Sequence, residues 1–276
     1  MISVYWERIK HNKLILSGGS GILLLIVAAV FSPWTAPYAP DAQALLERLQ
    51  APSLKHWMGT DDLGRDVFSR LLYGSRISLS VGFVAVSISS FFGSLVGLLS
   101  GFFGKWVDNC LMRVVDVLLC FPTFFLILMV IAFLEPNITN VMIIIGLTSW
   151  TGLARLVRGE SLAIRQRDYI LAAQALGVPN HKLLLSHLLP NVFAPIIVSA
   201  TLGIGGAILT ESSLSFLGLG VQPPAPSWGN MLTIGKDYIY FAWWLSLFPG
   251  LAILLTVLSF NLLGEGLRDV LDPRNI

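Results

Sequence analysis

Residues 77–103 read ISLSVGFVAVSISSFFGSLVGLLSGFF, and no Asp, Glu, Lys or Arg interrupts them. A helix of about 20 apolar residues crosses the hydrocarbon core of a bilayer, so this stretch is long enough to span a membrane. Five more charge-free runs of comparable length occur in the chain: Leu14–Trp34, Val117–Leu134, Ile138–Ala154, Asn191–Thr210 and Tyr238–Leu263. We therefore predict an all-α membrane protein with six transmembrane helices.

The composition of the chain also indicates a membrane protein. Its 276 residues are 55% hydrophobic and 12% charged, with a mean hydropathy of +0.75, whereas a soluble domain carries about 25% charged residues. This composition excludes a soluble globular fold and a disordered chain. Two cysteines, Cys110 and Cys120, are too few for a disulfide scaffold. A net charge of +2 without blocks of like charge argues against a nucleic-acid partner.

The distribution of Lys and Arg between the loops predicts the orientation. With the N-terminus inside the cell, twelve of the 18 basic residues lie on the cytoplasmic side and six lie outside. The first apolar run exceeds the roughly 7–15 residues of a signal-peptide core, so we expect an uncleaved anchor. The sequence thus predicts a multi-pass protein of the bacterial plasma (inner) membrane, with both termini in the cytoplasm.

Three segments lie outside the cell in this topology. The first, residues 35–75, ends in a stretch with apolar residues on one helical face and Asp66 and Arg70 on the other, which predicts an interfacial helix leading into the second span. The second is a short turn at residues 135–137. The third, Ser212–Gly235, contains three prolines and several glycines, so we expect an extramembrane or partly inserted loop.

One sizeable loop, residues 155–190, faces the cytoplasm. It reads as two short helices: the first covers Arg158–Leu176 and stops at Gly177, and Asn180 caps a second that ends at Pro190. Ala172, Ala173 and Ala175 give the first helix a surface of small residues that another backbone can approach. Physical reasoning leaves two alternatives open: a linker held on anionic headgroups, or a docking element for a cytoplasmic partner.

A search for catalytic, nucleotide and metal motifs finds none. The chain has no Gly-x-x-x-x-Gly-Lys-Ser/Thr phosphate loop and no His-Glu-x-x-His motif. All four histidines fall outside the predicted spans, so Ser20 in the Gly-rich run 18–21 has no histidine base, and we interpret these glycines as helix-packing residues. We predict that the chain is not an enzyme, holds no metal and binds no cofactor.

Charged residues at span ends are costly in a membrane and deserve individual interpretation. Arg113 and Asp116 lie three residues apart near the inner end of the third run, where we expect an ion pair that reaches the headgroups. Glu211 ends the fifth run and has no basic neighbour in sequence. Two interpretations of Glu211 stay open: it lines an outer gate or polar cavity, or it reaches the interface.

The inner loop resembles a known signature. Its sequence DYILAAQALG at 168–177, followed by Leu189-Pro190, is similar to the EAA signature of type I ABC-importer permeases. The matching positions are Ala172, Ala173, Gly177, Leu189 and Pro190. Leu171 replaces the signature glutamate and His187 replaces an isoleucine. The resemblance implies that this loop couples the spans to an ATPase subunit.

Further stretches are similar to the "C" permeases of dipeptide, oligopeptide and nickel importers. These stretches are HWMGTDDLGRDVFSR at 56–70, MRVVD at 112–116 with Phe121-Pro122, SFLGLGVQPP at 215–224 with Ser227-Trp228-Gly229, and the closing segment from Asn261 to Pro273. The resemblance implies a type I permease fold. It divides the chain into residues 1–34 with the first helix, an outer loop at 35–75, a core domain at 76–265 and a tail at 266–276.

The same resemblance implies partners and a substrate class. They are a second homologous permease, two ATP-binding subunits that carry ATP and Mg²⁺, and an extracytoplasmic binding protein that delivers short peptides. Nickel is the alternative substrate within the family. A stand-alone secondary transporter or channel is the alternative from another class, and it would work without an ATPase.

Overall fold

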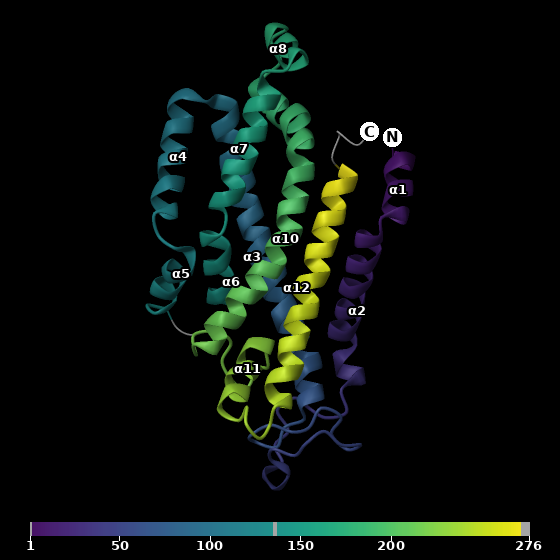
Figure 1. The fold of residues 1–276 in the computed structure, drawn as a ribbon. Helices are drawn as coiled ribbons and strands as arrows, with labels where there is room; N and C mark the ends of the chain where they lie inside the picture. The colour runs from purple at the N-terminus through teal and green to yellow at the C-terminus, as the bar shows by residue number, and fades with distance from the viewer. Residues whose placement is uncertain (1, 135–136, 272–276) are drawn as a thin grey trace.

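A computed structural model describes residues 2–134 and 137–271, and these residues are almost entirely helical, with no named strand among them (Figure 1). The predicted turn at Glu135 and Pro136 and the last residues of the tail, 272–276, lie outside the described residues. The helices are α1 (Ile2–His11), α2 (Lys13–Thr35), α3 (Val67–Phe103), α4 (Lys105–Leu119), α5 (Thr123–Ile131), α6 (Ile138–Thr148), α7 (Thr151–Arg165), α8 (Asp168–Ala175), α9 (Asn180–Lys182), α10 (Leu189–Phe216), α11 (Trp228–Asp237) and α12 (Trp244–Leu271).

Five helical stretches in the described part of the chain are long and apolar enough to cross a membrane, and the bent pair α4–α5 makes a sixth. The five are Lys13–Thr35, Val67–Phe103, Ile138–Arg165, Asn180–Phe216 and Trp244–Leu271. Their positions confirm the predicted all-α membrane fold, although most of these helices extend beyond the charge-free runs.

The third predicted span, Val117–Leu134, is wrong as a single straight helix. The structure breaks it into α4 and α5, which are bent by 81° relative to each other. Pro122 explains the break, because proline has no backbone N–H to donate and disfavours helical geometry at the preceding residue. Helix α4 begins at Lys105. Its Asp116 pairs with Arg155 of α7 at 2.6 Å and not with Arg113, the predicted partner.

Helix α3 occupies the centre of the bundle and packs against α2, α6, α7 and α10. Gly93, Gly97 and Gly101, each four residues apart, face α7. A Cβ atom on Gly97 would lie 2.7 Å from the carbonyl oxygen of Ala154, and one on Gly101 would lie 2.5 Å from the Ser161 Cβ. This spacing of small residues lets two membrane helices approach closely.

The first and last spans also approach closely through glycine. A Cβ atom on Gly18 of α2 would lie 2.5 Å from the Leu263 backbone nitrogen of α12, and one on Gly21 would lie 2.3 Å from the Ser259 Oγ. These distances confirm the packing role expected for Gly18 and Gly21, whereas Gly19 faces open space.

The stretch predicted as an interfacial helix leading into the second span is the first part of α3 itself, and the charged residues Asp66 and Arg70 are buried. Asp66 is the N-cap of α3, where its Oδ2 accepts a hydrogen bond of 2.8 Å from the Ser69 backbone N–H. Arg70 is 2% exposed and donates a 2.9 Å hydrogen bond to the Pro40 carbonyl. The outer loop folds back over the helix start, which the local charge pattern did not reveal.

The loop predicted at residues 155–190 is shorter in the structure. Helix α7 continues through Arg158 to Arg165, so the expected helix Arg158–Leu176 is divided at residues 166 and 167. Asn180 does not cap this helix, because it is the first residue of α9 and Pro179 occupies the N-cap position. The second helix does not end at Pro190, because a π-helical segment at 183–188 joins α9 to α10 continuously.

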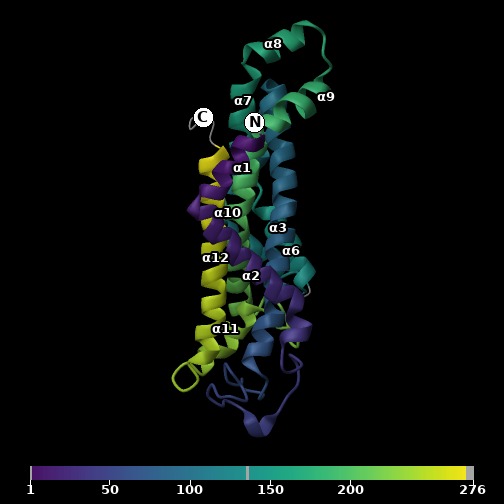
Figure 2. The same cartoon turned by 90° about the vertical axis from the view of Figure 1, so that its right-hand side faces the viewer.

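The start of α1 and the end of α12 lie at the same end of the bundle as α8, and the outer loop of residues 36–66 lies at the opposite end (Figures 1 and 2). The segment expected as a loop over Ser212–Gly235 includes the end of α10, a connection and α11. Two predicted domain boundaries, 75/76 and 265/266, fall within α3 and α12.

Candidate functional site

The helix α8 forms the tip of the inner loop and projects from the end of the bundle (Figure 2). It stops in a Schellman motif: the Gly177 N–H donates to the Gln174 carbonyl at 3.0 Å, and the Val178 N–H donates to the Ala173 carbonyl at 3.1 Å. Gly177 has φ of +77°, a conformation that favours glycine. The glycine therefore sets the reversal that returns the chain to the bundle.

One side of α8 is anchored and the other is exposed. Ile170 is fully buried in a cluster with residues of α3, α7 and α10, and Ala173 packs against the same cluster. On the outer side Ala172 is exposed, Leu171 is 49% exposed and Leu176 is 85% exposed. Exposed apolar side chains grouped on one short helix are typical of a surface that contacts another protein.

Leu189 and Pro190 lie at the start of α10, away from the tip. Leu189 packs against the same cluster as Ala173, which brings these two positions of the signature onto one core. The Leu189 N–H donates to the Leu184 carbonyl, five residues earlier. Pro190 cannot donate a backbone hydrogen bond. Because the turn before it is wider than an α-helical turn, the helix continues through this proline without a break. The continuous helix links α8 mechanically to the spans.

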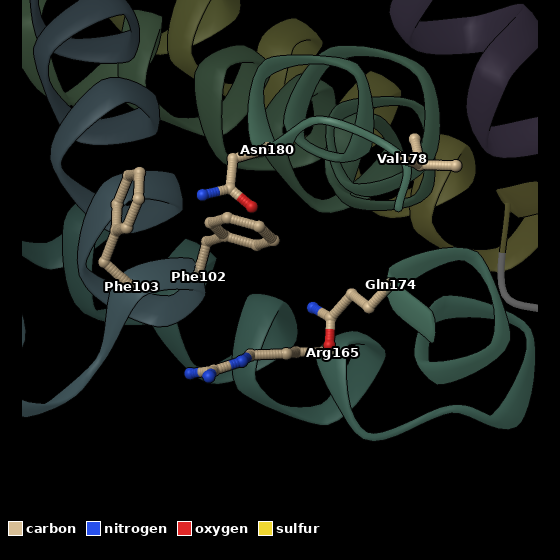
Figure 3. A pocket seen from close by; sticks show the side chains of 6 residues that line it. All are labelled: Phe102, Phe103, Arg165, Gln174, Val178 and Asn180. Atoms are coloured by element: carbon tan, nitrogen blue, oxygen red, sulfur yellow. The ribbon is translucent and has the colours of Figure 1, made fainter. Parts of the chain in front are cut away.

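A pocket of about 330 Å³ lies beneath α8 (Figure 3). Its lining residues come from the ends of α3 and α7, from α8 and from the chain that leads into α9: Phe102, Phe103, Arg165, Gln174, Val178 and Asn180. The guanidinium of Arg165 and the amides of Gln174 and Asn180 border the same opening (Figure 3). The pocket thus combines one cationic group, two amides and an apolar side.

A second cavity, of about 370 Å³, lies among the spans α3, α6, α7 and α10. Hydroxyl groups and small residues dominate its described lining, and none of those residues is charged: Ala85, Val86, Ser89, Ser90, Ile145, Ser149, Gly152, Leu153, Ser199, Ala200, Gly203, Gly206, Ala207 and Thr210. Ser90 Oγ is buried without a hydrogen-bond partner among the described residues. The cavity therefore offers hydrogen bonds within the apolar part of the protein. Sequence reasoning did not assign these residues, although several hydroxyls at helical spacing were a visible signal.

Glu211 is fully buried at the junction of α10 and α11 and does not line this cavity. Its Oε1 accepts hydrogen bonds from Ser215 Oγ at 2.7 Å and from Ser227 Oγ at 3.0 Å. Ser227 is the N-cap of α11. Glu211 Oε2 and Ser212 Oγ are buried without partners in the described part of the chain. The carboxylate thus ties the last turns of α10 to the start of α11.

Within residues 2–134 and 137–271, no group of three or more His, Cys, Asp and Glu side chains is arranged to hold a metal ion. The polar features instead follow the long axis of the bundle: a buried carboxylate near the outer loop, a hydroxyl-lined cavity among the spans, and a projecting helix at the end that carries the termini. This arrangement defines a multi-pass membrane protein with a polar cavity among its spans.

Comparisons with known proteins identify the family. The family described as "binding-protein-dependent transport system inner membrane component" matches residues 93–276, and the "N-terminal TM domain of oligopeptide transport permease C" matches residues 2–52. The chain therefore belongs to the binding-protein-dependent transport permeases of the inner membrane.

Three relatives illustrate the similarity. The dipeptide transport system permease protein DppC of Alkalihalophilus pseudofirmus is 44% identical over 269 residues, which covers 98% of this chain and 88% of the relative. The di/tripeptide permease DppC of Pseudomonas aeruginosa is 43% identical over 276 residues, with 98% and 91% covered. The glutathione permease GsiD of Escherichia coli O157:H7 is 44% identical over 271 residues, with 98% and 89% covered.

These matches confirm the resemblance to "C"-type permeases, the type I permease fold and the location in the plasma membrane. The family consists of transport permeases rather than enzymes. The chain is thus a permease subunit of an ABC importer.

Proposed function

We propose that this chain and a second, homologous permease form the path by which an ATP-driven importer moves short peptides delivered by an extracytoplasmic binding protein. The names of the relatives support this substrate class, since they specify dipeptides, di/tripeptides and glutathione. Nickel, the alternative within the family, is not favoured by these names.

The cavity among the spans supports a peptide substrate on chemical grounds. A peptide bond carries one donor and one acceptor that must remain paired when water is removed. Ser89, Ser90, Ser149, Ser199 and Thr210 provide hydroxyls that both donate and accept. The absence of charge among the described lining residues avoids strong retention of either peptide terminus. We assign the translocation path of this subunit to this cavity.

The projecting helix α8 is the observation that carries the coupling part of the proposal. We assign the ATPase contact to Ala172 and Gly177 on the exposed side of α8, with Ala173 holding this coupling helix on the core and Leu189 and Pro190 transmitting movement to α10. Leu171 provides an apolar contact where the signature has a glutamate, so docking here relies on apolar burial rather than on an ion pair. ATP and Mg²⁺ are then bound by the partner subunits and not by this chain.

The orientation follows from this assignment. The end with α8 and both termini faces the cytoplasm, and the outer loop faces the binding protein. Closure of two ATPases draws the inner loops of the two permeases together and favours an outward-open pore, and hydrolysis restores the inward-open state. We further assign Glu211 to the outer end of this movement, where it holds α11 against α10.

Charge introduced on the exposed side of α8 tests the docking assignment. We expect Ala172→Asp and Leu176→Asp to abolish co-purification of the ATPase subunits and peptide uptake, because both side chains are exposed and the fold does not depend on them. Gln166→Asp, also exposed but outside α8, is the matched control and should retain both ATPase co-purification and peptide uptake. Normal assembly and uptake in Ala172→Asp and Leu176→Asp would overturn the assignment.

A stand-alone transporter or channel would move peptides without any ATPase. For an ATP-driven importer, in contrast, vesicles that contain the two permeases without ATPase subunits should show no peptide uptake under any ion gradient. Uptake in these vesicles would exclude an ATP-driven importer.

A further inference from the structure

The pocket beneath α8 carries a positive charge that the protein does not neutralise. Helix α7 has three arginines on its way to this end of the bundle: Arg155 pairs with Asp116 at 2.6 Å and Arg158 pairs with Asp108 at 2.6 Å. Arg165 lines the pocket, and no carboxylate of the described residues lies within ion-pair distance of it. A half-buried guanidinium without a carboxylate attracts an anion.

The other walls of the pocket suit a phosphate group. The amides of Gln174 and Asn180 line the pocket together with Arg165 (Figure 3), so donor groups from three parts of the chain border one opening. Guanidinium groups bind phosphate through two parallel hydrogen bonds, and amide N–H groups complete the coordination. The volume of about 330 Å³ exceeds what a bare phosphate would occupy.

The apolar side of the pocket indicates what the phosphate is attached to. Phe102 and Phe103 end α3, and Phe103 is 40% exposed. Trp106, just beyond them, is 77% exposed, as expected for a residue at the boundary between hydrocarbon and headgroups. The exposed aromatic side chains Phe103 and Trp106 beside the opening favour a position near the headgroups of the bilayer.

We propose that this pocket binds the phosphodiester of an anionic phospholipid, with Arg165, Gln174 and Asn180 holding the phosphate and Phe103 contacting the glycerol and acyl chains. Because Gln174 belongs to α8 and Phe102 and Phe103 belong to α3, a bound lipid bridges the helix at the tip of the inner loop and the central span. The lipid thereby stabilises one position of α8. This inference does not depend on the substrate.

Lipid binding to the purified permease complex tests the inference. The probe is dioctanoyl phosphatidylglycerol, and native mass spectrometry measures how much of it remains on this chain. We expect Arg165→Gln to weaken its binding by about tenfold or more, since a charge-assisted bidentate contact is lost. Arg167→Gln, which removes an exposed arginine two residues away that does not line the pocket, should change binding less than twofold.

Two further measurements separate a lipid from free phosphate. Phe103→Ser should weaken phosphatidylglycerol binding and leave the helical circular dichroism unchanged, because Phe103 is partly exposed. Inorganic phosphate at 10 mM should not displace the lipid. Displacement by inorganic phosphate, or normal lipid binding in Phe103→Ser, would overturn the lipid as the source of the phosphate. Equal losses in Arg165→Gln and Arg167→Gln, or none in Arg165→Gln, would overturn the site itself.

Discussion

The guanidinium of Arg158 donates two hydrogen bonds to the carboxylate of Asp108, from Nε to Oδ1 at 2.6 Å and from Nη2 to Oδ2 at 2.7 Å. This contact joins α7 to α4 across 50 residues of sequence, and the Ser100 hydroxyl of α3 donates to the same carboxylate. Three helices thus meet at one ion pair near the end of the bundle that carries α8. The second pair between α4 and α7, Arg155 with Asp116, is half exposed.

We expect Asp108→Asn to destabilise the protein more than Asp116→Asn. Loss of the Asp108 charge removes a partly buried bidentate contact, worth about 1–3 kcal/mol, whereas an exposed pair contributes about 0–1 kcal/mol. Thermal unfolding of the purified complex in detergent measures both changes. Equal shifts for the two variants would show that the Arg158 contact does not hold α4 in place.

The cavity among the spans predicts a transport defect without a folding defect. Gly206 lines the cavity and a Cβ atom there would meet nothing within 4 Å, so the side chain of Gly206→Leu begins in open space beside the cavity. We expect at least tenfold slower peptide uptake with normal ATPase co-purification. Gly19→Leu, at an equally open position on α2 away from the cavity, is the control and should transport normally. Normal uptake in Gly206→Leu would place the path elsewhere.

Substitutions at Glu211 separate hydrogen bonding from charge. Glu211→Ala leaves the hydroxyls of Ser215 and Ser227 without their acceptor, and each buried unsatisfied group costs about 1–3 kcal/mol. Glu211→Gln retains an acceptor oxygen, and its amide can donate to the unpartnered Ser212 hydroxyl, so we expect stability within about 1 kcal/mol of the native protein. Thermal unfolding distinguishes the two variants. A large loss in Glu211→Gln would show that the charge itself is required.

The outer loop predicts a dependence on pH. Hydrogen bonds from Lys55 and then from His56 lower the pKa of Glu47 below its usual 4.5. A carboxyl group with a lowered folded-state pKa contributes its stability above the unfolded-state value, and this contribution is lost as the pH falls through the folded-state value. The unfolding temperatures of native protein and Glu47→Gln should therefore differ above pH 4.5 and converge as the pH falls through the lowered folded-state pKa of Glu47. A constant difference would contradict this account.

The sequence alone determined which segments enter the membrane and which residues identify the inner loop. Charge-free runs such as Ile77–Phe103 can be recognised locally, because a helix needs about 20 apolar residues to cross the hydrocarbon core of a bilayer. The stop at Gly177 was likewise predictable, since a left-handed residue at the end of a helix favours glycine. The remaining positions of the signature, Ala172, Ala173, Leu189 and Pro190, followed from their spacing in a known pattern.

Only the tertiary structure decided how charges and cavities are arranged, because these depend on partners far apart in the sequence. Asp66 and Arg70 look solvated in their own helix and are buried by the loop that folds over them. Asp116 pairs with Arg155, 39 residues away, instead of Arg113, three residues away. The hydroxyl-lined cavity and the pocket of Arg165 each require several helices to converge. Local hydrophobicity decides which segments form the spans, whereas packing between the helices decides where the cavity among them lies.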